Sequence, residues 1–450
     1  MSRVLGSIPP RGQVGGGWRI VPREDRRWYA ALAGLCAVRV AVPLAALVAS
    51  PGDLPGLPRY VYEPTPGDAQ GFYSAAREFI ASWGRLGAPA VLAGAVALLA
   101  VAFWAVRTWR ARPSARGWVV VVLAVAFSLA VVAAITQISR HTGAAVFGWP
   151  LLWALPMLPY RALGGPLDPD VAFGFGLALS LVANVGTVVA VWFIGLRATR
   201  RRSVALTAAA FFALWPILSG LVSGELGWTN GTWHVDAGLH LYDEPISTAL
   251  VAAAVAIVLG ELLGPVALVG AGGLLGLATV VRLSNGLLAA LVLGLLAAKV
   301  GPRRALPFLA GGLAFAPIVV AWWPRGYAAL FDRPDIWPPH PFSADYVVRN
   351  WTESLFFSSR AVLVLVPLAL LGAYALRGRF ALALLGGIVL VNAAFYSFYA
   401  NTAEHPRFLH VALPAVLVLW AAGAAGLALG LRKTLQGRGE RRRKPTMIGS

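Results

Sequence analysis

The stretch Pro265–Val300 reads PVALVGAGGLLGLATVVRLSNGLLAALVLGLLAAKV, and its charged residues are Arg282 near the middle and Lys299 near the end. One continuous helix of 36 residues would be about 54 Å long at 1.5 Å per residue, whereas a bilayer core is about 30 Å thick. The stretch therefore predicts two short apolar helices with a bend at Arg282–Gly286. Because each half has only some 16 residues, we expect the bend to lie below the outer membrane surface, with Arg282 at headgroup depth or deeper.

Similar apolar stretches recur along most of the chain. Of its 450 residues, 58% are hydrophobic and only 13% are charged, whereas charged residues make up about 25% of a typical soluble domain. The sequence thus predicts an all-α, polytopic membrane protein with about twelve spanning helices. The predicted spans are Tyr29–Ala49, Ala88–Val106, Gly117–Thr136, Val171–Gly195, Ser203–Gly220, Pro245–Leu263, Val266–Val281, Ser284–Lys299, Ala305–Pro324, Ala361–Leu376, Phe380–Ser397 and Leu409–Gly430.

The distribution of charge predicts the orientation of these spans. Basic clusters such as Arg107–Arg116, Arg200–Arg202 and Arg441–Lys444 fall on alternate connections, as the positive-inside rule requires of cytoplasmic segments. The opposite side of this topology carries 15 of the 19 acids. We therefore expect a multi-pass plasma-membrane protein with both termini cytoplasmic, and the net charge of +19 reflects orientation rather than binding to nucleic acid. Basic cytoplasmic segments at residues 1–28 and 431–450 then flank one membrane domain at residues 29–430.

One further apolar segment, Ala144–Leu163, does not fit this alternation. Counting it as a span would place Arg197 and Arg200–Arg202 outside. We predict an outer interfacial or re-entrant segment instead.

The first long outer loop contains a helical pattern. After Asp68, apolar residues recur with the spacing of one helix face, which predicts an amphipathic helix on the outer surface. These residues are Phe72, Ala75, Ala76, Phe79 and Ile80. Asp68 opens this helix either as an N-cap or as a functional carboxylate.

The third long loop, Glu225–Pro245, gathers acids, histidines and aromatic residues just before a span. His234, Asp236 and His240 are candidate ligands of a divalent cation, although a hydrogen-bonded loop with interfacial aromatic residues accounts for the same pattern. Near the end of the chain, Arg407 is either a snorkelling side chain or, together with Arg282, a second guanidinium that can bind phosphate at the outer face.

Four motifs in order resemble the GT-C superfamily of glycosyltransferases that use polyprenyl-phosphate sugars, such as protein O-mannosyltransferases and aminoarabinose transferases. Gly67–Arg77 resembles the Asp-plus-Tyr signature before a surface helix, and Phe147–Pro156 resembles the Gly-x-Pro-Leu-Leu re-entrant element. Leu275–Gly286 resembles the Gly-Leu-Ala-x-x-x-Arg-Pro-x-x-Gly hairpin, and His405–Pro414 resembles the Arg-Tyr-Leu-x-x-x-x-Pro ending.

The chain departs from the family pattern in several places. The helix pair within Ala88–Thr136 separates the first two motifs, and Arg282 is followed by Leu rather than Pro. The acid pair common in the first loop is not adjacent here, so that Glu63 or Glu78 would have to substitute. These departures leave the sugar and the acceptor undefined.

The resemblance implies a transfer reaction at the extracytoplasmic face. A lipid-linked sugar would bind in an outward-facing cavity, and Asp68 would deprotonate a hydroxyl of a cell-envelope glycan, lipid or protein, which displaces polyprenyl phosphate with inversion. Arg282 and Arg407 would stabilise the departing phosphate, or a divalent cation held by Asp236, Asp243 or Glu244 would do so. Tyr73, His405 and Glu244 are further candidate substrate-binding residues, Glu244 as the partner of a substrate hydroxyl.

Two other classes of membrane protein remain as alternatives. Twelve spans with both ends inside also describe a major-facilitator transporter, but charged residues within the predicted spans are nearly absent, and transporters often need them. The connection between the sixth and seventh spans is also very short, where such transporters have a long central loop. A membrane assembly subunit without chemistry is the third alternative.

Overall fold

The protein is described by a computed structural model. The residues that it describes are 23–49, 68–85, 116–138, 144, 146–218, 243–261, 263–326, 328, 342–351, 360–376, 378–400 and 406–443.

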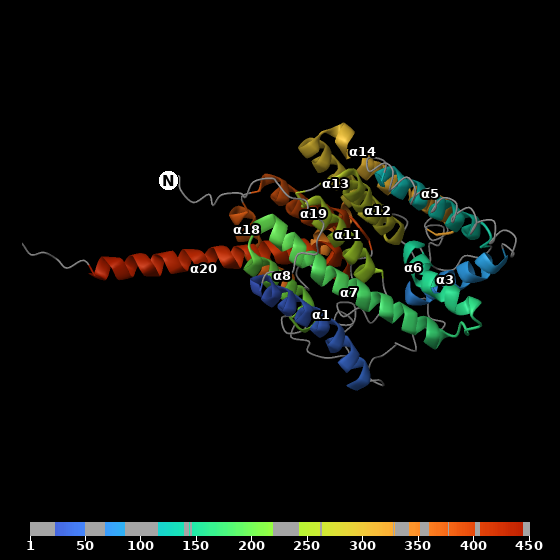
Figure 1. Ribbon diagram of the computed structural model, residues 1–450, viewed down its shortest axis with the longest axis horizontal. Helices are drawn as coiled ribbons and strands as arrows, with labels where there is room; N and C mark the ends of the chain where they lie inside the picture. Colours follow the sequence, from blue (N-terminus) through green and yellow to red (C-terminus); the bar gives the residue numbers. More distant parts are fainter. Residues whose placement is uncertain are drawn as a thin grey trace, which may run out of the picture.

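These residues are almost entirely helical (Figure 1), and within these ranges there is no β-strand, only an isolated bridge between Phe342 and Tyr399. The all-α prediction is confirmed. The helices are α1 (Arg23–Ala49), α3 (Asp68–Arg85), α5 (Arg116–Ile135), α6 (Gly148–Ala162), α7 (Pro169–Thr199), α8 (Arg202–Ala213), α11 (Glu244–Val258), α12 (Pro265–Val281), α13 (Asn285–Val300), α14 (Pro302–Leu313), α15 (Ala316–Trp322), α17 (Asp345–Arg349), α18 (Arg360–Ala375), α19 (Arg379–Ser397), the 3₁₀ helix η3 (Pro406–Ala412) and α20 (Leu413–Arg443).

Six of the described segments are long and apolar enough to cross a membrane. They are Arg26–Ala45, Arg116–Ile135, Val171–Thr199, Pro302–Trp322, Arg379–Ser397 and Leu409–Leu431. Each of the other predicted spans that the structure describes coincides with a shorter helix (α8, α11, α12, α13 or α18), whereas Ala88–Val106 lies outside the described residues. A membrane protein is thus supported, and twelve spans with cytoplasmic termini stay a prediction.

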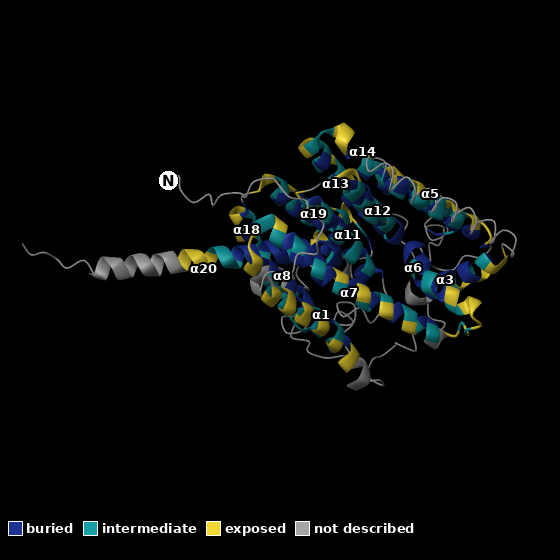
Figure 2. Ribbon diagram, in the orientation of Figure 1, coloured by how far each residue is buried: buried dark blue, intermediate teal, exposed yellow. Residues whose placement is uncertain are grey.

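The helices are packed around two apolar clusters. The larger cluster joins α7, α8, α11, α12, α13 and α20, and the smaller one joins α3, α5 and α6 to the ends of α12 and α15. Figure 2 shows the buried residues toward the centre of the bundle and the exposed residues on its outer helix faces. The exposed residues include large apolar ones such as Val182, Leu370 and Leu390. Apolar residues on the outside are what a lipid-facing surface requires.

The predicted bend in the stretch Pro265–Val300 is confirmed. Helix α12 ends at Val281, Arg282 adopts an extended conformation, and α13 begins at Asn285. The Ala278 carbonyl near the end of α12 accepts hydrogen bonds from the Arg282 backbone N–H at 2.8 Å and from the Asn285 side chain at 2.9 Å. The bend is thus closed by a side chain from the helix that follows it.

The predicted helix in the first long loop is confirmed as α3, and its place on the outer membrane surface stays a prediction. It begins at Asp68, and the five predicted apolar positions, Phe72, Ala75, Ala76, Phe79 and Ile80, are all buried. This face packs against α6.

Helix α6 lies between α3 and the bend. Its 15 residues extend about 22 Å at 1.5 Å per residue, which is shorter than a bilayer core of about 30 Å. Its first residue, Gly148, lies so close to α12 that an added Cβ would come within 2.3 Å of the Val281 nitrogen. Only glycine fits there without a shift of backbone, so α6 abuts the bend directly. That Ala144–Leu163 does not cross the membrane stays a prediction.

Candidate functional site

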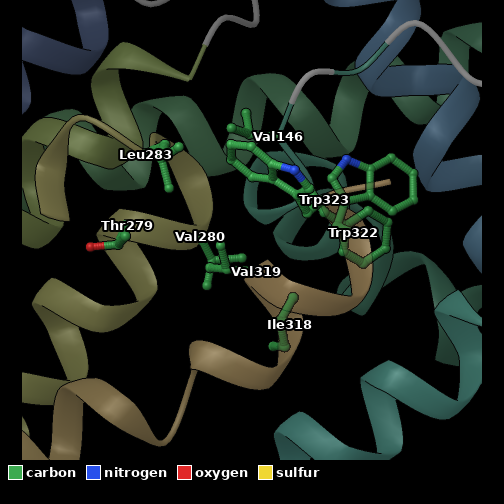
Figure 3. Close-up of a pocket in the computed structure, with 9 residues that line it drawn as sticks. Val146, Thr279, Val280, Leu283, Ile318, Val319, Trp322 and Trp323 are labelled. Atoms are coloured by element: carbon green, nitrogen blue, oxygen red, sulfur yellow. The ribbon is translucent and has the colours of Figure 1, made fainter. Parts of the chain in front are cut away.

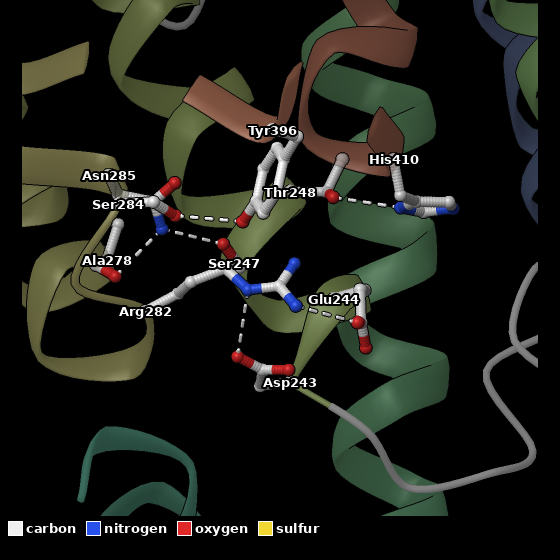
Figure 4. Close-up of polar contacts among 10 residues, drawn as sticks. All are labelled: Asp243, Glu244, Ser247, Thr248, Ala278, Arg282, Ser284, Asn285, Tyr396 and His410. Carbon is white, nitrogen blue, oxygen red and sulfur yellow. Dashed lines mark hydrogen bonds and ion pairs between the residues drawn. The ribbon is translucent and has the colours of Figure 1, made fainter. Parts of the chain in front are cut away.

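The bend holds a buried group of opposite charges. The Arg282 guanidinium donates through Nη2 to Glu244 Oε1 at 2.9 Å, and its Nε lies 3.4 Å from Asp243 Oδ2 (Figure 4). Asp243 is the N-cap residue of α11 and Glu244 is its first residue. The N-terminal end of a helix carries a partial positive charge, which stabilises both carboxylates.

The burial of this group makes its pairing necessary. Glu244 is 0% exposed and Asp243 is 7% exposed, and the Arg282 side chain is 11% exposed. An ion in a dry interior is several kcal/mol less stable than in water unless it is paired and hydrogen-bonded. Arg282 therefore stabilises both carboxylates, and removal of the guanidinium would leave two negative charges buried without a counter-charge.

Polar residues at the end of α19, at the start of α13 and in the first turn of α11 surround the ion pairs. The Tyr396 ring at the end of α19 lies 6.0 Å from the Arg282 guanidinium carbon, and its hydroxyl is 3.0 Å from Ser284 Oγ. The Asn285 amide, which also bonds Ala278, donates to Ser247 Oγ at 2.7 Å. These contacts lock the bend to α11 and α19, so the position of Arg282 is set from several sides (Figure 4).

A second buried polar group continues from this site into the bundle. His410 Nδ1 of η3 is 2.9 Å from Thr248 Oγ1 of α11, and its ring stands edge-on to Phe212 at 6.0 Å. Arg39 of α1 contacts the same Phe212 ring, with its guanidinium carbon 4.9 Å from the ring centre. Arg39 is 0% exposed and donates a hydrogen bond to Asn184 Oδ1 at 2.7 Å.

No role is predicted from the sequence for Arg39, Asn184, Thr248 or His410. The signal for Arg39 is nevertheless present, because an arginine within an apolar span is costly unless it serves a purpose. Charge within the spans is therefore not confined to the bend.

Helix α6 connects α3 to the bend through apolar contacts. Phe79 of α3 meets Phe147 edge-on at 5.4 Å, and Phe147 contacts Trp322 of α15 at 4.6 Å between ring centres. The residue after Phe147 is Gly148, which abuts Val281 next to Arg282. The two predicted halves of the site therefore belong to one continuous packed unit.

An apolar groove borders the bend on the side of α15 (Figure 3). It is lined by Val146, Val280, Leu283 and Trp322, among others, and holds about 270 Å³ of space that includes open solvent. Leu283, which follows Arg282 directly in sequence, lines this groove, as does Thr279 in the last turn of α12.

Tyr73 lies inside the interface between α3 and α6. It is buried, its ring contacts Trp153 at 6.3 Å, and its hydroxyl donates to the Leu167 carbonyl at 3.3 Å. Burial raises the pKa of the Tyr73 hydroxyl, and the positive charge of Arg77 opposes this more weakly. In this structure Tyr73 is a protonated donor that ties α3 to the α6–α7 connection.

The remaining predicted site residues are only partly described. The structure gives the backbone of Asp68 at the start of α3 and of Arg407 in η3, and their side chains lie outside its description. His405, His234, Asp236 and His240 lie outside the described residues altogether. Of the predicted residues, the structure thus brings together Arg282, Asp243 and Glu244.

Metal binding has limited support. Within the part of the chain that the structure describes, no three His, Cys, Asp or Glu side chains come close enough to hold a metal ion. Asp243 and Glu244 are the two weak candidates inside that part, and both contact Arg282. A positive guanidinium in that place neutralises the charge that would attract a cation.

A scan of the chain against protein-family models finds no match, and a search of curated proteins finds no related sequence.

Proposed function

We propose that this chain is a membrane glycosyltransferase that moves a sugar from a polyprenyl-phosphate donor to a hydroxyl acceptor on the outer side of the membrane. Arg282 binds the donor phosphate, and Asp68 is the general base. The observation that carries the proposal is the paired guanidinium of Arg282 at a break between two short apolar helices. A guanidinium fits a phosphate through two parallel hydrogen bonds, and the interaction strengthens away from bulk water.

The buried carboxylates prepare Arg282 for an anion. Asp243 and Glu244 balance the charge of the guanidinium and hold its orientation before a ligand arrives. A phosphate oxygen that reaches Arg282 then shares or replaces a carboxylate contact, an exchange between two anions of similar geometry. Glu244 therefore has the role of orienting Arg282, in place of the substrate-hydroxyl contact expected from the sequence.

The reaction needs one base and one cation. Asp68 takes the proton of the acceptor hydroxyl while its oxygen forms a bond to the anomeric carbon of the sugar. The bond from that carbon to the phosphate oxygen breaks on the opposite face, so the configuration inverts. Negative charge develops on the leaving polyprenyl phosphate, and Arg282, joined by Arg407, stabilises it.

The test is a transfer assay with purified protein. Incubation with a panel of polyprenyl-phosphate sugars should release polyprenyl phosphate in the presence of a hydroxyl acceptor, and Arg282→Ala should slow the release by about 10- to 100-fold. Failure of every donor to react with well-folded protein would overturn the proposal.

A transporter is the second candidate function, because Arg39 is a fully buried charge inside α1. The buried polar residues extend from α1 and α7, which carry Arg39 and Asn184, to η3 and α11, where His410 contacts Thr248. Arg39, Glu244 and Arg282 all act electrostatically on His410. Chains of buried polar residues carry ions or protons in transporters. Uptake of a labelled anion into vesicles that is lost in Arg39→Gln, without any sugar transfer, would favour the transporter.

A further inference from the structure

The segment Phe342–Trp351, which includes α17, holds the C-terminal end of α19. The Asn350 amide nitrogen lies within hydrogen-bond distance of three carbonyl oxygens, those of Tyr396 at 3.1 Å, Ser397 at 2.9 Å and Tyr399 at 2.8 Å. Asn350 is 0% exposed. The last carbonyl groups of a helix have no partner within the helix, and this amide supplies one.

Further contacts fix the same segment on both sides of Asn350. Trp351 Nε1 donates to Ser397 Oγ at 2.8 Å, and the Ser343 backbone donates to the Phe398 carbonyl at 3.0 Å. Arg349 donates to the Ala400 carbonyl. The end of α19 is therefore held by side chains and backbone together.

The residue that this arrangement holds in place is Tyr396. Its backbone carbonyl accepts from Asn350, while its side chain reaches the other way, to Ser284 and the Arg282 guanidinium. Figure 4 shows Tyr396 above the Arg282 guanidinium and Asp243 below it. The guanidinium thus lies between an aromatic ring and a carboxylate.

We propose that Tyr396 is a positioning residue for Arg282. Asn350, in the segment Phe342–Trp351, fixes Tyr396 through its hydrogen bonds to the end of α19. The inference rests on the proposed function, since the role of Arg282 as phosphate ligand is part of that proposal. The attraction of a guanidinium to an aromatic face adds to the ion pairs, and the Ser284 contact fixes the bend on which Arg282 is carried. An arginine fixed before binding loses less freedom when the phosphate arrives.

Two matched pairs of variants separate positioning from general packing. Tyr396→Phe and Tyr399→Phe each remove one hydroxyl from the same aromatic cluster, but the Tyr396 hydroxyl is the one that contacts Ser284. Asn350→Ala removes the amide contacts to α19, and Asp345→Asn alters the same segment at an exposed residue. Tyr396→Leu removes the aromatic ring as well.

The first readout does not depend on activity. We expect the rate at which phenylglyoxal modifies Arg282, followed by peptide mass spectrometry, to rise roughly three- to tenfold in Tyr396→Leu and Asn350→Ala. Tyr396→Phe should show a smaller rise, whereas Tyr399→Phe and Asp345→Asn should match the wild type. The second readout is the donor KM, which we expect to rise by a similar factor with a smaller change in kcat.

An unchanged modification rate of Arg282 in Tyr396→Leu, Asn350→Ala and Tyr396→Phe would overturn the inference. Equal rises in the Tyr399→Phe and Asp345→Asn controls would also overturn it, since they would indicate general loosening. If the modification rates follow the prediction while the wild type transfers no sugar, the positioning role holds and the proposed donor is wrong.

Discussion

Helix α3 and the α12–α13 bend each carry one half of the proposed reaction, and they are built from opposite kinds of contact. The buried face of α3 is apolar and packs on α6, and Asp68 stands at its first position, before that face begins. The bend is held by ion pairs and hydrogen bonds that converge on Arg282. A change at Asp68 therefore leaves the packing of α3 intact, whereas a change at Arg282 disturbs buried charges.

The largest effect on turnover is expected at Asp68. Asp68→Asn keeps the size of the side chain and removes the basic oxygen, so the rate of transfer should fall by roughly 10²–10⁴, the usual contribution of general base catalysis. Donor binding should survive, because the lost interaction belongs to the transition state. Measurement of kcat alongside donor Kd tests both statements.

Equal loss of donor binding in Asp68→Asn would make Asp68 a structural helix cap. Near-normal transfer would move the role of the base to Asp236, Asp243 or Glu244.

The second-largest effect on transfer is expected from a substitution at the bend. Arg282→Ala should weaken donor binding and turnover together by about 10- to 100-fold, since the guanidinium contacts the phosphate before and during reaction and a charge-assisted hydrogen bond contributes about 1.5–3 kcal/mol. It should also lower thermal stability, because Asp243 and Glu244 lose a buried counter-charge. The double variant Arg282→Ala with Glu244→Gln should recover part of that stability but none of the binding. Recovery of binding would show that Arg282 acts only on Glu244.

The smallest effect is expected at Gly148, where the two regions meet. In Gly148→Ala the new methyl group would lie about 2.3 Å from the Val281 backbone, so α6 must move away from the bend. We expect the free energy of unfolding to fall by about 1–3 kcal/mol and the rate of transfer to fall by less than about tenfold. Gly174→Ala is the matched control, since nothing lies within 4 Å of an added Cβ there. Equal stability and equal transfer activity of the two variants would show that the contact of α6 with the bend does not support the site.

The helices that carry these residues could be predicted from the sequence, because the length of an apolar stretch and the spacing of its residues are local properties of the chain. The bend at Arg282 follows from a mostly apolar stretch of 36 residues, which is too long for one span. The buried face of α3 follows from the spacing of Phe72 and Phe79. Both predictions are confirmed.

The partners of the site residues could not be predicted, because they depend on how distant helices meet. Nothing in the sequence pairs Arg282 with Glu244 or Asn350 with Tyr396, which lie 38 and 46 residues apart. Arg39 shows the same limit: its place inside an apolar stretch is a local signal, but its contacts with Asn184 and Phe212 come from α7 and α8. The sequence singles out Tyr73 only through a resemblance to a motif of another family of proteins, and the packing of α3 on α6 shows that Tyr73 is buried.

The central claim is that Arg282 binds the phosphate of a lipid carrier. The most direct test compares the affinities of the protein, in lipid nanodiscs, for polyprenyl phosphate and for the uncharged polyprenol. The two ligands share the lipid chain and differ only in the phosphate. We predict that the wild type binds polyprenyl phosphate at least about tenfold more tightly than polyprenol, and that Arg282→Ala removes this preference. Equal affinity of the wild type for the two lipids, or an unchanged preference in Arg282→Ala, would contradict the claim.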